Sequence, residues 1–144
     1  MRITSRFTIA VHALLCIHAF QDRQKVTSDF IASSVNVNPV IIRRIIIQLH
    51  AAGLIAVARG AGGSTLARKL RDVTLLDVYN AVESVEGSLF NFHESPNPKC
   101  PVGKNIHKVL DRHLLDAMES MERSLRAVTL ADLAGDLARI RRAG

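Results

Sequence analysis

Apolar residues recur every three or four positions along most of this chain, which is the spacing of amphipathic α-helices. Residues 5–21 predict a first helix that is capped by Ser5. A second helix is expected from Thr27, a good N-cap residue, to about Val35. The positions predicted to face the core are Ile9, Ala13, Cys16, Ile17 and Phe20 in the first helix, and Phe30, Ile31 and Val35 in the second.

A third helix is predicted from Pro39 to about Ala52. Asn38 is a favourable N-cap, and a proline at the first helical position leaves no needed N–H group missing. Gly53 supplies the left-handed conformation that ends a helix. The core face of this helix is expected to carry Ile42, Ile45, Ile46 and Leu49. Two helices joined by the short turn at 36–38 predict a helix-turn-helix.

The periodicity then changes to that of strands. Residues 54–58 and 65–67 predict an antiparallel pair, with the glycine-rich loop Arg59-Gly60-Ala61-Gly62-Gly63-Ser64 between them. A helix-turn-helix followed by such a ribbon predicts a winged helix, which places one helix in the major groove of DNA and a loop beside it. A capping box at residues 74–77 predicts a further helix that ends near Glu83.

The last third of the chain predicts a long exposed helix. Prolines interrupt residues 86–103, and a helix is then expected from about Lys104 to Arg126, followed by a short one from Leu130 to about Ile140. The apolar positions of the long helix follow a near-heptad spacing: Ile106, Leu110, Leu114, Ala117, Met121, Leu125 and Val128. This spacing favours a partner helix and hence a homodimer, although the stripe could instead cover its own domain.

Together these elements predict a mainly α fold, a winged helix-turn-helix with a two-stranded wing and a long C-terminal dimerisation helix. We divide the 144 residues into a DNA-binding domain (1–84), a sensor-type loop (85–103) and the dimerisation and C-terminal helices (104–144). The chain has five Phe, one Tyr and no Trp, a composition that suits aliphatic packing between helices.

Positive charge is concentrated in the predicted winged helix. Residues 1–72 contain ten Lys or Arg and three Asp, a net charge of +7, whereas residues 73–144 contain nine cations and ten acids, a net charge of −1. Such asymmetry indicates binding to phosphates, although a solvated basic face has the same composition. Its coincidence with the helix-turn-helix favours double-stranded DNA as the partner.

The residues predicted to contact DNA are Thr27, Ser28, Asn38, Pro39, Val40, Arg43, Arg44, Arg59, Gly60, Gly62 and Gly63. Neighbouring helical residues point about 100° apart, so one of Arg43 and Arg44 is expected to reach a guanine edge and the other a phosphate. The sequence does not decide between them. The three glycines allow positive φ and a close approach to phosphate, while Arg59 is expected in the minor groove. A nucleotide-binding loop is the alternative, but the loop lacks the Lys-Ser/Thr ending of a P-loop and joins two strands.

Four motifs together resemble the Rrf2 family of bacterial winged-helix transcription regulators. They are Asn38-Pro39-Val40 through Arg43-Arg44, Ala52-Gly53-Leu54-Ile55, the Arg59–Ala67 ribbon and the Thr74–Glu83 helix. The resemblance extends over residues 1–128, and the stretch at 98–103 is most similar to the YwnA-like branch. It implies a DNA-binding homodimer whose dimerisation helix corresponds to about residues 104–126. Several members of the family hold a [2Fe–2S] cluster on three cysteines in the loop before that helix.

The corresponding loop here contains one cysteine, Cys100, so no cluster, no other metal and no cofactor is expected. A mixed site of Cys100 with His93 and His107 remains an alternative. Cys100 is also a candidate redox sensor, because Lys99, Lys104 and the start of the long helix would lower the pKa of its thiol. It could equally be a small residue without reactivity. The effector, if any, is unknown.

The remaining features favour a cytoplasmic repressor. Two cysteines suit a reducing compartment, and Cys16 is expected in the core. The uncharged segment at 7–21 resembles a signal peptide but is too short to span a membrane and lacks a cleavage site. No catalytic residues are predicted, although a thiol enzyme built on Cys100 and His107 is one alternative. A winged-helix docking module without specific DNA binding is the other.

Overall fold

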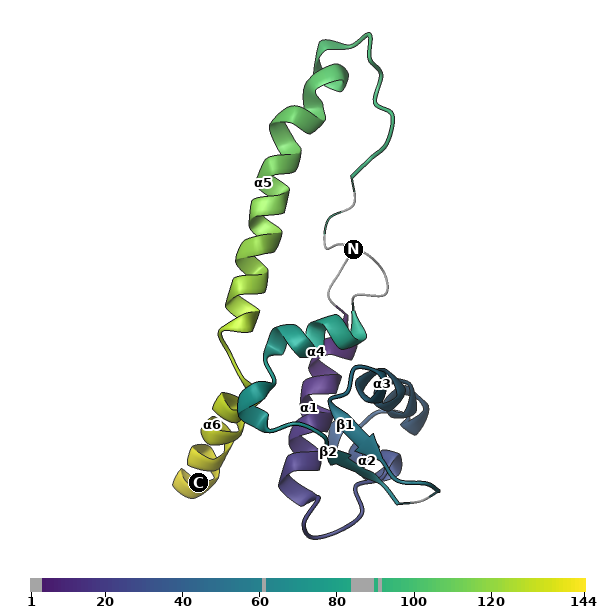
Figure 1. Cartoon of the computed structure of the whole chain (residues 1–144), viewed down its shortest axis with the longest axis vertical. Coiled ribbons are helices and arrows are strands. Elements are labelled where there is room, and N and C mark those ends of the chain that lie inside the picture. The colour runs from purple at the N-terminus through teal and green to yellow at the C-terminus, as the bar shows by residue number, and fades with distance from the viewer. Residues whose placement is uncertain (1–3, 61, 84–89, 91) are drawn as a thin grey trace.

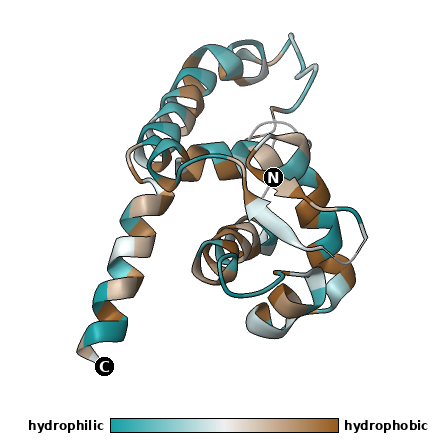
Figure 2. Cartoon of the chain, turned by 60° about the horizontal axis from the view of Figure 1, so that its bottom comes forward, coloured by the Kyte–Doolittle hydropathy of each residue, from teal (hydrophilic) through white to brown (hydrophobic). Residues whose placement is uncertain are grey.

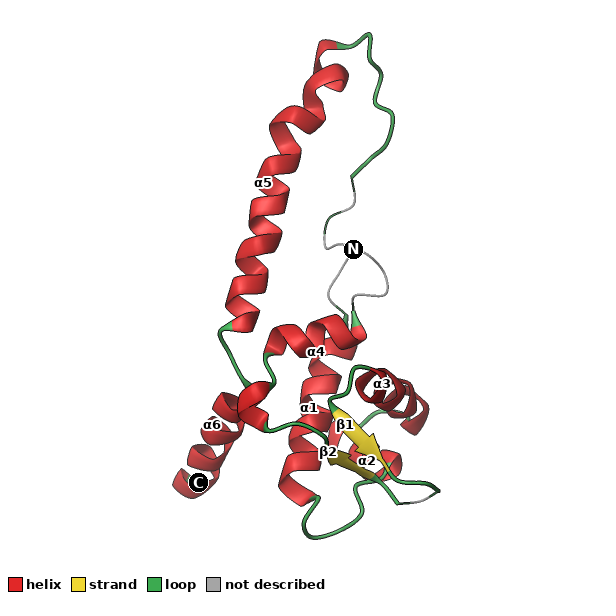
Figure 3. Cartoon of the chain, viewed as in Figure 1, coloured by secondary structure: helices red, strands yellow, loops and turns green. Residues whose placement is uncertain are grey.

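The computed structural model describes residues 4–60, 62–83, 90 and 92–144. A winged-helix domain lies at one end of the molecule, and one long helix extends away from it (Figure 1). The elements, in order, are α1 (Ser5–Phe20), α2 (Ser28–Val35), α3 (Pro39–Ala51), β1 (Ile55–Val57), β2 (Ser64–Leu66), a 3₁₀ turn η1 (Leu70–Asp72), α4 (Leu75–Val82), α5 (Pro101–Arg126) and α6 (Leu130–Ala143). Figure 3 shows that helices dominate and that the two short strands form the wing.

The helix boundaries follow the capping residues. Thr27 accepts a hydrogen bond from Phe30 N at the start of α2, and Thr74 and Thr129 form reciprocal capping boxes at the starts of α4 and α6. Gly53 has a φ of 76° just after α3, as predicted. The capping predictions at these positions, including the Asn38-Pro39 start of α3, are confirmed.

The prediction that Ser5 caps α1 is wrong by one residue. The cap is Thr4, whose hydroxyl oxygen accepts a hydrogen bond from Arg6 N at 3.2 Å. Thr4 is held in place by the buried carboxylate of Glu83, which accepts hydrogen bonds from both the Thr4 amide and its hydroxyl. This contact joins the start of α1 to the end of α4, and spacing along the chain gave no sign of it.

The hydrophobic core lies among α1, α2, α3, α4 and the wing. Its largest fully buried aliphatic side chains are Leu14, Ile17, Ile31, Ile42, Ile45, Leu49, Leu54, Ile55 and Leu130. The predicted core face of α3 is confirmed, since all four of its residues are buried. Cys16 is also buried, as predicted. Of the other predicted core positions, Ile9, Phe20, Phe30 and Val35 are only half-buried at the edge of this cluster.

The wing is shorter than predicted. Its strands have three residues each and pair antiparallel, with Ile55 opposite Leu66 and Val57 opposite Ser64. The second strand begins at Ser64, one residue earlier than expected, because Ser64 already pairs with Val57. The Ser64 amide donates to the Val26 carbonyl at 2.9 Å. That bond attaches the wing to the segment just before α2.

The long helix also starts earlier than predicted. It begins at Pro101 rather than Lys104, with Cys100 as the N-cap residue. Pro101 was expected to interrupt regular structure. A proline is compatible with the first helical position, however, because no hydrogen bond from its nitrogen is needed there and its φ suits a helix. The helix returns toward the winged-helix domain, where the Leu75 amide donates to the Val128 carbonyl after α5. The Leu130 amide at the start of α6 donates to the Val73 carbonyl. In Figure 2, α6 runs to the C-terminus with mixed hydrophobic and hydrophilic residues.

Candidate nucleic-acid interface

Helices α2 and α3 have the relative orientation of a helix-turn-helix. The chain bends by 115° between them, within the 90–120° usual for this motif. Asn36 turns the chain with a left-handed φ of 66°, and the Asn38 side chain accepts a hydrogen bond from Val40 N at 2.9 Å. The polar turn residues therefore expose the N-terminal end of α3, the end that enters the major groove in this motif.

The outer face of α3 carries both arginines and several exposed apolar side chains. Val40, Ile41 and Ile47 are exposed, opposite the buried isoleucines. Arg43 and Arg44 point to different neighbours, as the helical geometry requires. Arg43 lies on the α2 side, with its guanidinium 3.5 Å from an Asp29 carboxylate oxygen. Arg44 instead lines a groove on the α1 side together with Arg6, Ile41, Ile47 and Gln48.

The Arg43–Asp29 pair is open to water. The two side chains are 56% and 76% exposed, and such pairs contribute roughly 0–1 kcal/mol. Arg43 can therefore exchange Asp29 for a base edge or a phosphate at little cost. The sequence did not identify Asp29 as a neighbour of Arg43, or Arg6 as a neighbour of Arg44. The signal for Asp29 was its position at the start of the preceding helix.

The wing loop contains glycines with three different roles. Gly60 has a φ of 66° and open space around it, which suits the tip of the loop. Gly63 has a φ of 80°, and a Cβ there would lie 2.8 Å from Val26 N. At Gly62, a Cβ would lie 2.4 Å from that of Ala58. Close packing across the loop therefore requires Gly62.

The other predicted contact residues lie near these elements. Thr27 is half-buried and serves as the cap of α2, and Ser28 is the half-buried first residue of that helix. Arg59 is exposed just after β1, whereas Ala61 lies outside the described residues. Through the Val26–Ser64 hydrogen bond, the start of α2 and the base of the wing are adjacent.

The candidate sensor residue lies far from this surface, at the start of α5 (Figure 1). Cys100 is exposed, and the backbone N–H groups of Gly103 and Val102 lower the pKa of its thiol. The predicted influence of the helix start is thus present. The backbone N–H groups cause the lowering of this pKa, rather than the side chains of Lys99 and Lys104, which were also predicted to contribute.

The histidines near Cys100 contact one another. The ring centroids of His93 and His107 are 5.0 Å apart. His107 Nδ1 is 3.0 Å from the Asp111 carboxylate oxygen Oδ1. In the part of the chain that the structure describes, no three His, Cys, Asp or Glu side chains lie close enough together to hold a metal ion.

The sequence profile of the Rrf2 family, described as an iron-dependent transcriptional regulator, matches residues 3–136. The chain belongs to the Rrf2 family. The predicted family, the winged-helix fold class and the prediction that the chain is not an enzyme are confirmed, because the family and its relatives are transcriptional regulators.

Individual Rrf2 relatives resemble the chain over nearly its full length. YwnA of Bacillus subtilis, named as a candidate HTH-type transcriptional regulator, is 41% identical and the match covers 94% of this chain and 98% of YwnA. The structure of a candidate transcriptional regulator from Lactobacillus plantarum is 30% identical, with a TM-score of 0.81 over 94% of this chain and 91% of that one. IscR of T. potens, 24% identical with a TM-score of 0.63, covers 95% of this chain and 88% of its own and shares the fold.

Among the described residues, no single helix is both long and apolar enough to cross a membrane. Only α2 and α3 taken together reach that length, and the turn between them bends the chain by 115°.

Proposed function

We propose that the chain is a cytoplasmic repressor that binds an imperfect palindrome in promoter DNA as a homodimer. The observation that carries this proposal is the outer surface of α3, where Arg43 and Arg44 are exposed opposite a fully buried apolar face. The wing loop lies on the same domain with Arg59 exposed. Each protomer would insert α3 into the major groove of one half-site and lay the wing along the adjacent minor groove.

The two arginines of α3 are assigned different roles. Arg43 is assigned to the base edge, because its exposed guanidinium lies beside the start of α2 and can leave the weak pair with Asp29 at little cost. The released guanidinium can then make bidentate contact with a guanine edge. Arg44 shares its groove with Arg6, and two cations side by side suit the phosphate backbone.

Dimerisation would occur through α5. The helix has 26 residues and none is buried in the single chain. Val102, Val109 and Leu110 are exposed at spacings of seven and eight residues, so they form one stripe. The half-buried residues Leu114, Met121 and Leu125 lie along the other edge of the apolar face. The apolar face thus has a partly covered edge and an open edge, which a second copy would cover. Val102 and Val109 on the open edge were not part of the predicted seam, whereas Leu110 was.

Cys100 is the proposed redox-responsive residue. Its thiol is exposed and its pKa is lowered by the first-turn amides of α5. Thiolate character and exposure are the two properties that make a cysteine sensitive to oxidation. A disulfide or mixed disulfide there would alter the start of the dimerisation helix rather than the DNA-binding surface.

The primary test is a binding titration by fluorescence anisotropy, using DNA from upstream of the protein's own gene and a scrambled duplex as the control. Contacts to six or more phosphates predict a loss of affinity of about 10³-fold or more between roughly 50 and 200 mM salt. The upstream duplex should bind more tightly than the scrambled one at both salt concentrations. Equal and weak binding of both duplexes would refute the proposal and favour the docking-module alternative.

Variants then separate the arginine roles. Arg43→Ala should cost about 1–3 kcal/mol on the operator and relax discrimination at one base pair. Arg44→Ala and Arg59→Ala should weaken the operator and the scrambled duplex alike. Arg112→Ala, an exposed arginine on α5, is the matched control and should leave both affinities unchanged. If Arg44→Ala alone alters base discrimination, the two roles are reversed.

A further inference from the structure

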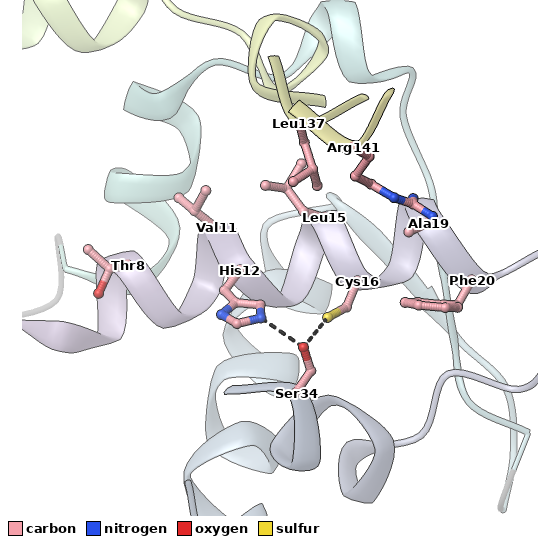
Figure 4. Close-up of a pocket in the computed structure, with 10 residues that line it drawn as sticks. All are labelled: Thr8, Val11, His12, Leu15, Cys16, Ala19, Phe20, Ser34, Leu137 and Arg141. Carbon is pink, nitrogen blue, oxygen red and sulfur yellow. Dashed lines mark hydrogen bonds between the residues drawn. The ribbon is translucent and has the colours of Figure 1, made fainter. Parts of the chain in front are cut away.

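A pocket of about 500 Å³ lies between α1, α2 and α6 (Figure 4), and no residue of α3 lines it. Val11, Leu15 and Phe20 from α1 and Leu137 from α6 provide its apolar wall. A volume of this size, mostly apolar lining and a position between helices are the usual properties of a small-molecule site. Neither DNA binding nor the proposed dimer contact on α5 uses these side chains.

Polar groups lie at separate places around this wall (Figure 4). The Ser34 hydroxyl of α2 is 2.9 Å from His12 Nε2 and accepts a hydrogen bond from Cys16 Sγ at 3.2 Å. Arg141 of α6 also lines the pocket. Within the described residues Arg141 has no carboxylate partner, whereas Arg139 of the same helix pairs with Asp136. The pocket therefore combines an apolar wall with an unpaired guanidinium.

We propose that this pocket binds a small amphipathic carboxylate as the effector of the regulator. The hydrocarbon part would pack on Leu15 and Leu137, and the carboxylate would pair with the Arg141 guanidinium. Guanidinium groups recognise carboxylates through paired hydrogen bonds. The regulatory part of this inference depends on the proposed DNA-binding function, whereas binding of the carboxylate does not.

The position of the pocket explains how a ligand could influence DNA binding. Leu137 and Arg141 belong to α6, which follows the proposed dimerisation helix, while Ser34 belongs to α2, which packs directly on α3. A ligand between these helices contacts both the C-terminal segment and the helix-turn-helix. The ligand changes the affinity of the protein for DNA only if it binds the DNA-bound and the DNA-free conformations of the protein with different affinities.

The test uses isothermal titration calorimetry of the full chain with octanoate and with its neutral analogue octanamide. Octanoate should bind with one site per chain and more tightly than octanamide. Arg141→Gln should reduce octanoate affinity by about three- to fivefold, the size expected for an ion pair near the surface, and abolish the preference over octanamide. Arg142→Gln is the matched control, because this neighbouring arginine does not line the pocket.

A second variant tests the pocket itself. Ala19→Phe places a ring in the pocket and should abolish binding of both compounds, with circular dichroism confirming that the helices persist. No saturable octanoate binding, or binding unchanged in Arg141→Gln and Ala19→Phe, would overturn the proposal. Conversion of Ala19→Phe to a monomer would also overturn it, because the groove would then belong to a second copy. DNA affinity is measured separately on the ligand-free protein. An absence of specific DNA binding in that measurement would contradict the proposed function but not the binding of the carboxylate.

Discussion

The winged-helix domain and helix α5 differ in how completely they bury their apolar faces. Side chains such as Leu14, Ile45 and Leu49 are fully buried in the domain. By contrast, α5 is the longest helix in the described chain and has no buried residue. The comparison indicates that the domain completes its own core, whereas α5 has an apolar face that its own chain covers only in part.

The difference follows from the surroundings of each helix. In the domain, α1 is packed against α2, α3, α4 and the wing, so its apolar positions have neighbours on several sides. In α5, Val102 and Val109 are about two-thirds exposed. Amphipathic patterning alone therefore does not tell a core helix from an interface helix, because both need only one apolar face.

The largest expected effect is the loss of a core side chain of α3. Ile45→Ala should reduce the free energy of unfolding by about 2–5 kcal/mol, because the site is fully enclosed and a cavity would remain. Lys108→Ala, on the polar face of α5, should change it by less than about 0.5 kcal/mol. Urea denaturation followed by circular dichroism measures both. A small effect of Ile45→Ala would show that the domain core is not closed.

The next effect tests the open face of α5. Leu110→Asp should leave the winged-helix domain folded, since Leu110 is exposed in the single chain, but should prevent dimer formation. Operator affinity should then fall by roughly a hundredfold or more, because each monomer contacts one half-site. Sedimentation velocity and anisotropy measure the two changes. The control is Lys108→Asp, which introduces the same side chain on the polar face of α5. If Leu110→Asp still forms a dimer of unchanged stability, the dimer interface does not lie on this face of α5.

The sequence predicted the elements whose signals are local. The capping residues Thr27, Asn38 and Thr74 and the stop at Gly53 depend on neighbours within a few positions, and all four were predicted correctly. The core face of α3 followed from its spacing. The predicted start of the long helix was wrong at Pro101, because a proline can either interrupt a helix or occupy its first position.

What the sequence could not provide are contacts between distant positions. The bond from Thr4 to Glu83 joins residues 79 positions apart, and the pair of Arg43 with Asp29 depends on how α2 and α3 cross. The pocket between α1, α2 and α6 likewise requires the position of α6, which no periodicity specifies. For the candidate site, the sequence identified the cations but not their neighbours.

A smaller effect distinguishes the base of the wing from its tip. Gly63→Ala should destabilise the domain by about 1–3 kcal/mol, since it combines strain at positive φ with a clash against the Val26 backbone. Gly60→Ala has the same strain but open space, so it should cost about 1–2 kcal/mol at most. Urea denaturation ranks the two variants. Equal reductions in the free energy of unfolding would mean that the contact between Gly63 and Val26 does not contribute to stability. The wing would then not be part of the tightly packed domain.

The smallest effect on folding is expected at the cysteines, which also differ between the two regions. Cys16 is buried in the domain and Cys100 is exposed at the start of α5. Because the pKa of Cys100 is lowered, its thiolate persists to lower pH than that of an ordinary cysteine. In the native protein, iodoacetamide should therefore modify Cys100 while Cys16 reacts only after unfolding, and the midpoint of the pH–rate profile should lie below the ordinary thiol pKa.

Cys100→Ser should leave stability unchanged and remove any effect of mild oxidation on DNA affinity, with Cys16→Ala as the control. A rate profile with an ordinary midpoint, or an oxidation response that survives Cys100→Ser, would exclude this thiol as the sensor and leave α5 with a structural role alone.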